Sequence, residues 1–373
     1  MDNLQDRVGV PSVTIDWYRS LPWWPLCSRA ITTAWRMSHL VVGTVAAMLV
    51  TIGWNVADSI FGDPTSVFQS ASLAGNPIIG TWQDLTHAVL AFREGGGLVE
   101  LARILFGGLW TVVICAGLGG MLARRSVYEM STQSPADWGT TFRLVKSRFT
   151  SLLWTLVMPW SALVVLLIPA LMLGLLGRLG SVGIWIAGLA MIPMVLLMIG
   201  AGWLALLGVL GFPLAVTAVV AEKQADAFDG FSRSAAYLYQ RPFTFGLGVA
   251  LANLIAWGAA FAVDYAMKMG LQVFFAAFEL ASAQPIHQDG SRIHFGFAFA
   301  EDFMQLVITG FVFSFFWSAA AALYLTLRHE IDHTDMDEID LFEKQPAKSI
   351  PSIGSPPSPE NNPALSGVHE QAE

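Results

Sequence analysis

Residues 179–221 read LGSVGIWIAGLAMIPMVLLMIGAGWLALLGVLGFPLAVTAVVA, a run of 43 positions without a charged side chain. A helix needs about 20 apolar residues to cross the hydrocarbon core of a bilayer. A run of this length therefore predicts an integral membrane protein. One straight helix over the whole run would be roughly 60 Å long, so the run contains either one bent span or two spans joined by a tight turn.

We adopt one span for this run, from about residue 182 to residue 210. The chain is then expected to bend at Gly211-Phe212-Pro213, because Pro213 lacks an N–H and its ring clashes with the preceding turn. The remaining residues would form a short helix at the cytoplasmic surface. Two spans would instead reverse the direction of every later segment.

The composition of the whole chain agrees with a membrane protein. Of its 373 residues 54% are hydrophobic and 13% are charged, about half the charged fraction of a soluble domain. The net charge of -8 belongs to the segment from His329 onward, because acids and bases balance in residues 1–328. A basic face for nucleic acid is not supported.

Five other apolar runs are long enough to cross a membrane. The predicted fold class is therefore all-α, a polytopic bundle of about six transmembrane helices with two cytoplasmic amphipathic elbow helices. The expected spans are 37–57, 104–123, 150–175, 182–210, 243–263 and 303–327. These spans contain no Asp, Glu, Lys or Arg, groups that ion-coupled transporters normally need.

Three regions follow from these spans. Residues 1–36 form an interfacial N-terminal segment, 37–328 the six-span membrane domain and 329–373 an acidic tail. The tail is rich in Pro, Ser, Asn and Glu, which cannot bury a core, so it is expected to be disordered. Two external loops, 58–100 and 264–302, are expected to lie on the membrane surface.

The positive-inside rule gives the orientation. With six spans, fifteen bases fall on one side and five on the other. The fifteen are Arg7, Arg19, Arg29, Arg36, Arg124, Arg125, Arg143, Lys146, Arg148, Lys223, Arg233, Arg241, Arg328, Lys344 and Lys348. A seven-span arrangement would flatten this bias, so we expect both ends of the chain in the cytoplasm.

The two cytoplasmic elbows have similar patterns. In the first, Ser134 is expected to cap a helix whose apolar face comprises Trp138, Phe142, Val145 and Phe149. In the second, Asp226 is expected to cap a helix whose apolar face comprises Phe228, Phe231, Ala235 and Leu238. The order span, elbow, span thus occurs twice, which indicates a parallel duplication about the membrane normal. The alternative is that any loop between spans becomes amphipathic.

The second elbow also carries a family resemblance. The sequence DAFDGFSRS at 226–234, followed by Tyr237 and Arg241-Pro242, resembles bacterial multi-pass proteins similar to the membrane domain attached to some glycerophosphodiester phosphodiesterases. Gly53-Trp54 and residues 324–339 belong to the same resemblance. It implies a bacterial cytoplasmic membrane protein and carries no activity, and the chain shows no phosphodiesterase catalytic domain.

His329-Glu330-Ile331-Asp332-His333 matches the H-E-x-x-H pattern of zinc proteases. The pattern sits between the last span and the acidic tail, where no soluble domain can form a cleft. The resembling family has its Arg and Asp at the positions of Arg328 and Asp332, so the two histidines are incidental to it. We expect a solvated helix end here.

Three weaker features complete the search for a site. His287, Asp289 and His294 in the second external loop could form a metal site, although a solvated loop is the simpler interpretation. Cys27 and Cys115 are expected to be unpaired thiols. Small residues of the fifth span are expected to pack against other helices, namely Gly246, Gly248, Ala250, Ala256 and Ala260.

The sequence thus predicts no catalytic, cofactor-binding or metal-binding residue, and no cofactor. We expect a non-enzymatic membrane-organising or partner-binding protein that contacts membrane lipids and other membrane proteins. The alternative is a permease for a neutral or lipid-like substrate, with a path near Pro213. A cavity at bilayer depth would favour the alternative, and a filled bundle would favour the first hypothesis.

Overall fold

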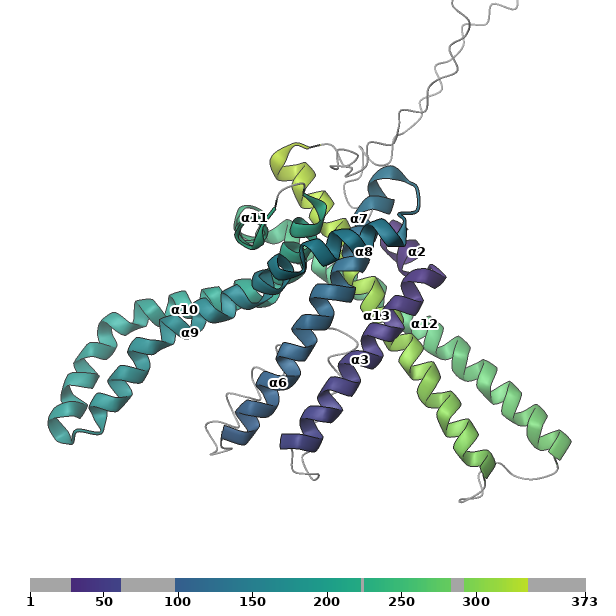
Figure 1. Ribbon diagram of the computed structural model, residues 1–373, viewed down its shortest axis with the longest axis horizontal. Coiled ribbons are helices and arrows are strands. Elements are labelled where there is room, and N and C mark those ends of the chain that lie inside the picture. The colour runs from purple at the N-terminus through teal and green to yellow at the C-terminus, as the bar shows by residue number, and fades with distance from the viewer. Residues whose placement is uncertain (1–27, 62–97, 223–224, 283–291, 335–373) are drawn as a thin grey trace, which may run out of the picture. The chain divides into compact units, whose positions relative to one another are not determined.

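The computed structural model describes residues 28–61, 98–222, 225–282 and 292–334. Every element in these ranges is helical, which confirms the all-α fold class (Figure 1). Six helices are long and apolar enough to cross a membrane, and they overlap the six predicted spans. They cover Met37–Phe61, Leu101–Thr132, Phe149–Gly177, Ser181–Ala221, Pro242–Ala281 and Phe299–Asp332. The chain is therefore a multi-pass membrane protein.

The run at 179–221 forms one continuous helix, α10 (Ser181–Ala221), as the single-span interpretation requires. The expected short surface helix after Pro213 is wrong, because α10 continues through this proline and 213–221 is its most buried part. Each of these nine residues is buried, and all except Pro213, Leu214 and Thr217 are Ala or Val. Neighbouring helices pack around this end, so the interior proline bends the helix instead of ending it.

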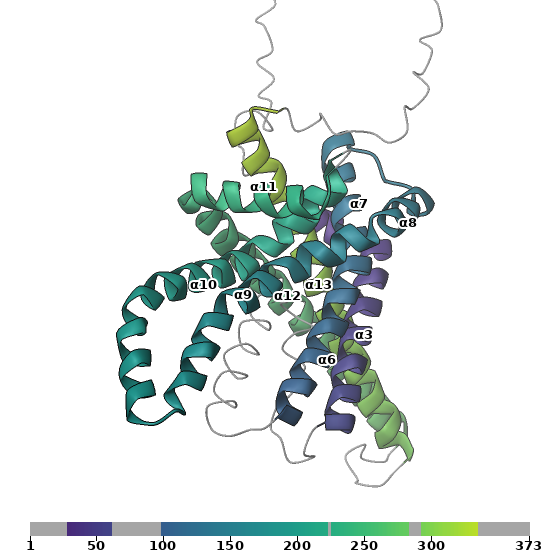
Figure 2. The same ribbon diagram turned by 60° about the vertical axis from the view of Figure 1, so that its left-hand side comes forward.

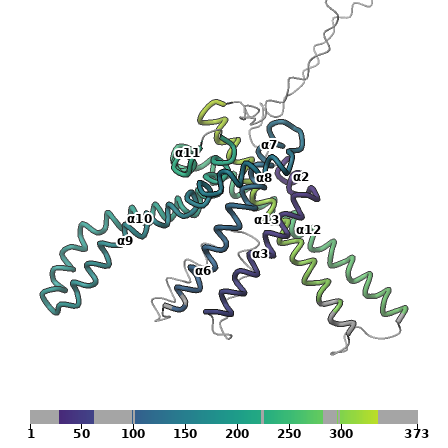
Figure 3. The backbone as a smooth tube through the Cα atoms, in the orientation of Figure 1, coloured from purple at the N-terminus to yellow at the C-terminus, as the bar shows by residue number. Residues whose placement is uncertain are grey.

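Helix α9 (Phe149–Gly177) lies beside α10 as an antiparallel hairpin (Figure 3). The turn between them uses Gly180 at φ +86°, a conformation that glycine adopts without strain. Both helices bend along their length (Figure 2). Each contains two interior prolines, Pro159 and Pro169 in α9 and Pro193 and Pro213 in α10, which account for the bends.

Helix α13 (Arg292–Asp332) is the central element. It contacts the short α2 (Ala30–Ala34) and the longer helices α3 (Met37–Phe61), α10 and α12 (Pro242–Ser282). Gly43 of α3 and Gly310 of α13 let two backbones meet, because a Cβ on Gly43 would lie 2.2 Å from the Gly310 carbonyl oxygen. Such close crossings are how small residues associate membrane helices.

The second span consists of α6 (Leu98–Ile114), a π-helical turn (Cys115–Gly119) and α7 (Gly120–Thr132). It continues nine residues past the predicted end at 123, so that Arg124 and Arg125 are buried residues of a helix. The π-turn brings Gly119 against the indole of Trp317, which would lie 2.4 Å from a Cβ at this position. Single π-turns of this kind often occur at functional sites.

Helices α3 and α6 interlock through two tryptophans. Trp54 fills the space over Gly107 and donates from Nε1 to Thr111 Oγ1 at 3.1 Å. Trp110 fills the space over Gly53 and donates to a backbone carbonyl of α3. An ion pair, Arg103 with Asp58 at 2.7 Å, closes the far end of this pair of helices.

The two elbows are α8 (Trp138–Ser147) and α11 (Ala227–Gln240). Asp226 caps α11, as predicted, by accepting from Asp229 N at 2.8 Å. The predicted cap of α8 is wrong, since Asp137 and not Ser134 accepts from the first turn.

The buried faces of the elbows mix polar, apolar and small residues. They comprise Thr141 and Val145 in α8, and Gly230, Ser234, Tyr237 and Leu238 in α11. Phe142 and Phe228, which were expected on the apolar faces, are 53% and 62% exposed. These two phenylalanines therefore remain available to the membrane interface.

Several predictions fall partly or wholly outside the described residues. These are most of segment 1–36, the external loop after Phe61, and the tail beyond Thr334. Residues 264–282 of the other expected external loop continue α12 as a helix, and α13 begins at Arg292. The fifth and sixth spans are thus longer than predicted at this end.

Candidate functional site

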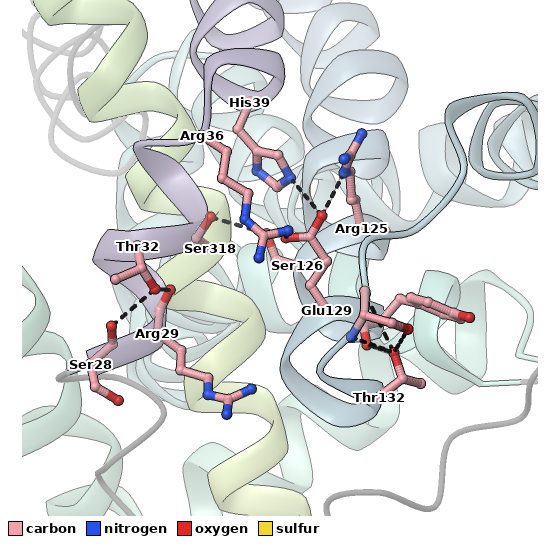
Figure 4. A network of polar contacts seen from close by, with 12 residues as sticks. Ser28, Arg29, Thr32, Arg36, His39, Arg125, Ser126, Glu129, Thr132 and Ser318 are labelled. Atoms are coloured by element: carbon pink, nitrogen blue, oxygen red, sulfur yellow. Dashed lines mark hydrogen bonds and ion pairs between the residues drawn. The ribbon is translucent and has the colours of Figure 1, made fainter.

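A charged cluster lies where α3, α7 and α8 meet (Figure 4). Glu129 of α7 accepts a hydrogen bond from Arg125 Nε at 2.7 Å and pairs with Arg36 Nη1 at 2.8 Å. The Nε2 atom of His39 lies 3.7 Å from the same carboxylate. The guanidinium of Arg125 also lies 4.2 Å from the ring centroid of Trp138, a cation–π geometry. We call Arg36, His39, Arg125 and Glu129 the Glu129 cluster.

This cluster is buried at its centre. The side chains of His39 and Glu129 are 0% and 2% exposed, whereas Arg36 is 46% exposed. Both ring nitrogens of His39 and Nη1 of Arg125 have no hydrogen-bond partner among the described residues. Removing one partner of a buried ion pair leaves the other charge buried without a counter-charge, which strongly destabilises a protein. The Glu129 cluster therefore fixes how α3 and α7 are joined.

Two arginines close the end of α10. The last carbonyl groups of a helix lack partners within that helix. Arg124 Nη1 donates to Val220 O at 3.0 Å, and Arg148 Nη1 donates to Val219 O and Glu222 O, both at 2.5 Å. These contacts satisfy carbonyl groups that would otherwise be buried without partners, so 213–221 can lie inside the bundle.

A second polar cluster joins α10, α11 and α13. Glu222 Oε1 accepts from the Tyr324 hydroxyl at 2.8 Å and lies 3.2 Å from Arg328 Nε. Arg233 of α11 lies 3.6 Å from the same oxygen and 4.0 Å from Asp332 Oδ2. We call these residues, together with Tyr237, the Glu222 cluster.

Tyr237 ties α11 to the end of α13. Its hydroxyl donates to Asp332 Oδ2 at 2.5 Å. Burial raises the pKa of Tyr237 above 10.0, and the hydrogen bond to Asp332 raises it further. The phenol therefore stays protonated, which keeps it a hydrogen-bond donor to the carboxylate.

The Glu222 cluster collects the residues of the family resemblance. Arg233 and Tyr237 come from the DAFDGFSRS segment and its continuation, while Tyr324, Arg328 and Asp332 come from the run that starts at residue 324. Their side chains meet although they are about 90 residues apart in the chain. The motif residues thus have a structural reason to occur together.

An apolar cleft of about 100 Å³ lies between α10, α12 and α13. Pro213 is among its lining residues, as is Phe245 of α12, and Asn253 is the one amide-bearing side chain there. The full lining comprises Leu210, Pro213, Leu214, Phe245, Val249, Ala252, Asn253, Ala256, Val312, Phe315, Phe316, Ala319, Ala320 and Leu323. A cavity with such walls stays dry and takes apolar ligands.

The cleft lies next to the Glu222 cluster. Leu323 lines it, and the neighbouring Tyr324 binds Glu222. All its residues belong to the apolar helices that could span a membrane. The cavity at Pro213 is therefore the feature that the hypothesis of a permease for a neutral or lipid-like substrate predicts, and the sequence signal for it was the interior proline.

The remaining candidate residues are not brought together. His329 lies at the end of α13 with Nδ1 3.1 Å from Thr334 O, and His333 has left the helix at φ +53°. No group of three potential metal ligands occurs among the described residues. His287 and Asp289 lie outside the described residues, and nothing is described of the side chain of His294.

The cysteine and small-residue predictions have mixed outcomes. Cys115 is a buried free thiol in the π-turn, while Cys27 lies outside the described residues. Gly246 does not pack as expected, because a Cβ there would meet nothing within 4 Å. Ala256 lines the cleft.

No protein-family model matches this chain, and no curated protein or solved structure matches it. The resemblance to the membrane domain of certain glycerophosphodiester phosphodiesterases therefore stays a prediction. The cleft and the two polar clusters are the features of the described residues that bear on function.

Proposed function

We propose that this protein is a non-enzymatic membrane protein that binds a lipid-like molecule in the cleft between α10, α12 and α13. The cleft carries the proposal, because it is an apolar cavity within helices that cross the membrane. Burying an acyl chain there gains dispersion contacts with Phe315, Phe316 and Leu323 that a void would lose.

Binding is better supported than passage through the bundle. A substrate moving from the cleft along α13 would meet the Glu222 cluster, where Tyr324 is fully buried and bonded to Glu222. Arg328 and Asp332 follow on the same helix and are also engaged. These contacts close the polar end of the cleft, so we favour a bound lipid over a transported solute.

The placement in the cell is part of the proposal. The charged ends of α7, α10 and α13 gather with α8 and α11 (Figure 1), and nine of the 20 bases of the chain belong to residues 120–148, 222–241 and 328–332. By the positive-inside rule this polar end faces the cytoplasm of a bacterial cell, with the N- and C-termini on that side. Membrane lipids are the proposed partners, and the exposed phenylalanines of the elbows suit contacts with lipid or with other membrane proteins.

Photolabelling tests the proposal. Purified protein is reconstituted with a phosphatidylcholine that carries a diazirine in one acyl chain, and the labelled peptides are identified by mass spectrometry. Adducts should concentrate in 245–256 and 312–323. Ala256→Phe should reduce them at least fivefold, because the ring fills the cleft.

Gly258→Phe is the matched control, since this position of α12 faces open space. If Ala256→Phe does not fold, Val249→Phe fills the cleft two turns nearer the N-terminus of α12. Equal labelling in the filled and control variants would overturn the proposal.

A further inference from the structure

We infer that the cleft selects an acidic phospholipid of one leaflet, whose phosphate is bound by Arg241. This inference rests on the proposed function. It adds the class of lipid headgroup and the residue that recognises this headgroup. Arg241 joins α11 to α12, and its side chain is exposed.

The backbone fixes Arg241 directly beside the cleft. Its N–H donates to Tyr237 O at 3.1 Å, and its carbonyl accepts from Phe245 N at 2.9 Å. Phe245 is the first residue of α12 that lines the cleft. Arg241 is thus one helical turn from the cleft on one side and one turn from the Glu222 cluster on the other.

The register of α12 points the same way. Phe245, Val249, Ala252 and Ala256 line the cleft at spacings of four, three and four residues, which define one face of a helix. Arg241 immediately precedes this helix, one turn before Phe245, with a backbone that is not helical (φ −133°, ψ 56°). A molecule in the cleft that extends towards the polar end therefore passes Arg241.

The depth of the cleft fits half a bilayer. From Phe245 to Ala256 the helix rises roughly 16 Å at 1.5 Å per residue, against about 15 Å for one leaflet of a 30 Å hydrocarbon core. An acyl chain in the cleft would then place its phosphate at the level of Arg241. This match argues for a phospholipid of one leaflet.

The charge around Arg241 favours an anion. The acids of the neighbouring cluster are already engaged: Glu222 by Tyr324 and Arg328, and Asp332 by Tyr237. A guanidinium binds phosphate through paired hydrogen bonds. Zwitterionic lipids add a positive group at this level, so an acidic headgroup gains more from the site.

The experiment measures headgroup preference. Protein in vesicles of equimolar phosphatidylglycerol and phosphatidylcholine is released into detergent, and bound lipids are counted by native mass spectrometry. Wild type should retain phosphatidylglycerol preferentially. Arg241→Gln should lower this preference about fivefold, the factor expected for one basic residue beside anionic lipid, and Arg241→Lys should retain most of it.

Arg143→Gln is the matched control, because Arg143 is an exposed arginine of the other elbow. An unchanged preference in Arg241→Gln, or an equal loss in Arg143→Gln, would overturn the inference. Acyl-chain photolabelling of Arg241→Gln separates the two proposals. If labelling persists in the cleft while preference does not change, the headgroup inference fails and the proposed function stands; if the filled variants also label normally, both fail.

Discussion

Helices α12 and α13 are both 41 residues long and lie next to each other, yet they occupy opposite environments. In the most apolar stretch of α13, 72% of the residues are buried, compared with 6% in the most apolar stretch of α12. Trp317 of α13 is fully enclosed, while Trp257 of α12 is 70% exposed and stacks on Phe261 of its own helix. Similar apolarity therefore does not predict which membrane helix forms the core.

The difference comes from what each helix offers to its neighbours. Around its centre α13 has Gly310, Ser314 and Ser318, which permit a close crossing with α3 and hydrogen bonds to Ala34 O and Ser126. Three of the four glycines of α12, Gly246, Gly258 and Gly270, face open space, and Gly248 is buried. Lipid takes the place of a protein partner along the exposed face of α12. This is possible because the side chains on that face are apolar.

The two tryptophans give the sharpest test of this comparison. Trp317→Ala should destabilise the protein by about 3–5 kcal/mol, because it leaves a cavity in a closed core. Trp257→Ala should change stability by less than about 0.5 kcal/mol. Unfolding of the detergent-solubilised protein by SDS titration measures both. Similar losses would contradict the assignment of α13 as the core and α12 as lipid-facing.

Carboxylates extend the comparison to charge. Glu129→Gln leaves Arg125 without its anion in a buried site and should cost about 3–5 kcal/mol. Asp264→Asn breaks an exposed pair with Lys268 on α12 and should cost about 0.3–0.5 kcal/mol. The same SDS titration applies. A small effect at Glu129 would show that the Glu129 cluster does not hold α3 to α7.

A smaller effect than at Trp317 or Glu129 is expected at the polar end of α13. Tyr237→Phe removes the hydrogen bond to Asp332 and should cost about 0.5–1.5 kcal/mol at neutral pH. The pKa of Tyr237 is raised above 10.0 in the folded protein, so folding favours the protonated phenol. Its contribution is complete below pH 10 and is lost as the pH rises through the folded-state pKa.

Stability against pH checks this sign. Wild type should lose stability relative to Tyr237→Phe only at alkaline pH above about 10. A difference that already changes between pH 6 and pH 8 would mean that another group controls this contact.

Local signals in the sequence predicted the spans and one of the two caps. The single pass at 179–221 and the Asp226 cap were correct because helix length, charge placement and cap residues act within a few residues of each other. The Ser134 cap was wrong, because Asp137 accepts from Thr140 N while the Ser134 hydroxyl lies 2.9 Å from that of Thr132. The helical end at 213–221 was missed because its partners, Arg124 and Arg148, come from distant segments.

The site depended even more on distant contacts. Pro213 marked the cleft, but its walls come from three helices whose order in space no local pattern gives. The Glu129 cluster was missed because its two arginines were assigned to cytoplasmic segments. The spacing of Arg125 and Glu129, four residues apart on a helix, was a signal that could have suggested a paired, continuing helix.

The central position of α13 also has a consequence for synthesis. Chains emerge from the ribosome N-terminal end first, so the first five spans are inserted before the helix that they surround exists. Before α13 is inserted with Trp317 and Tyr324, the faces of α3, α7 and α10 that pack against these residues contact lipid or one another. A chain truncated before residue 292 would therefore consist of correctly inserted spans without a core, and membrane proteases that recognise loosely packed helices could distinguish it from the finished protein.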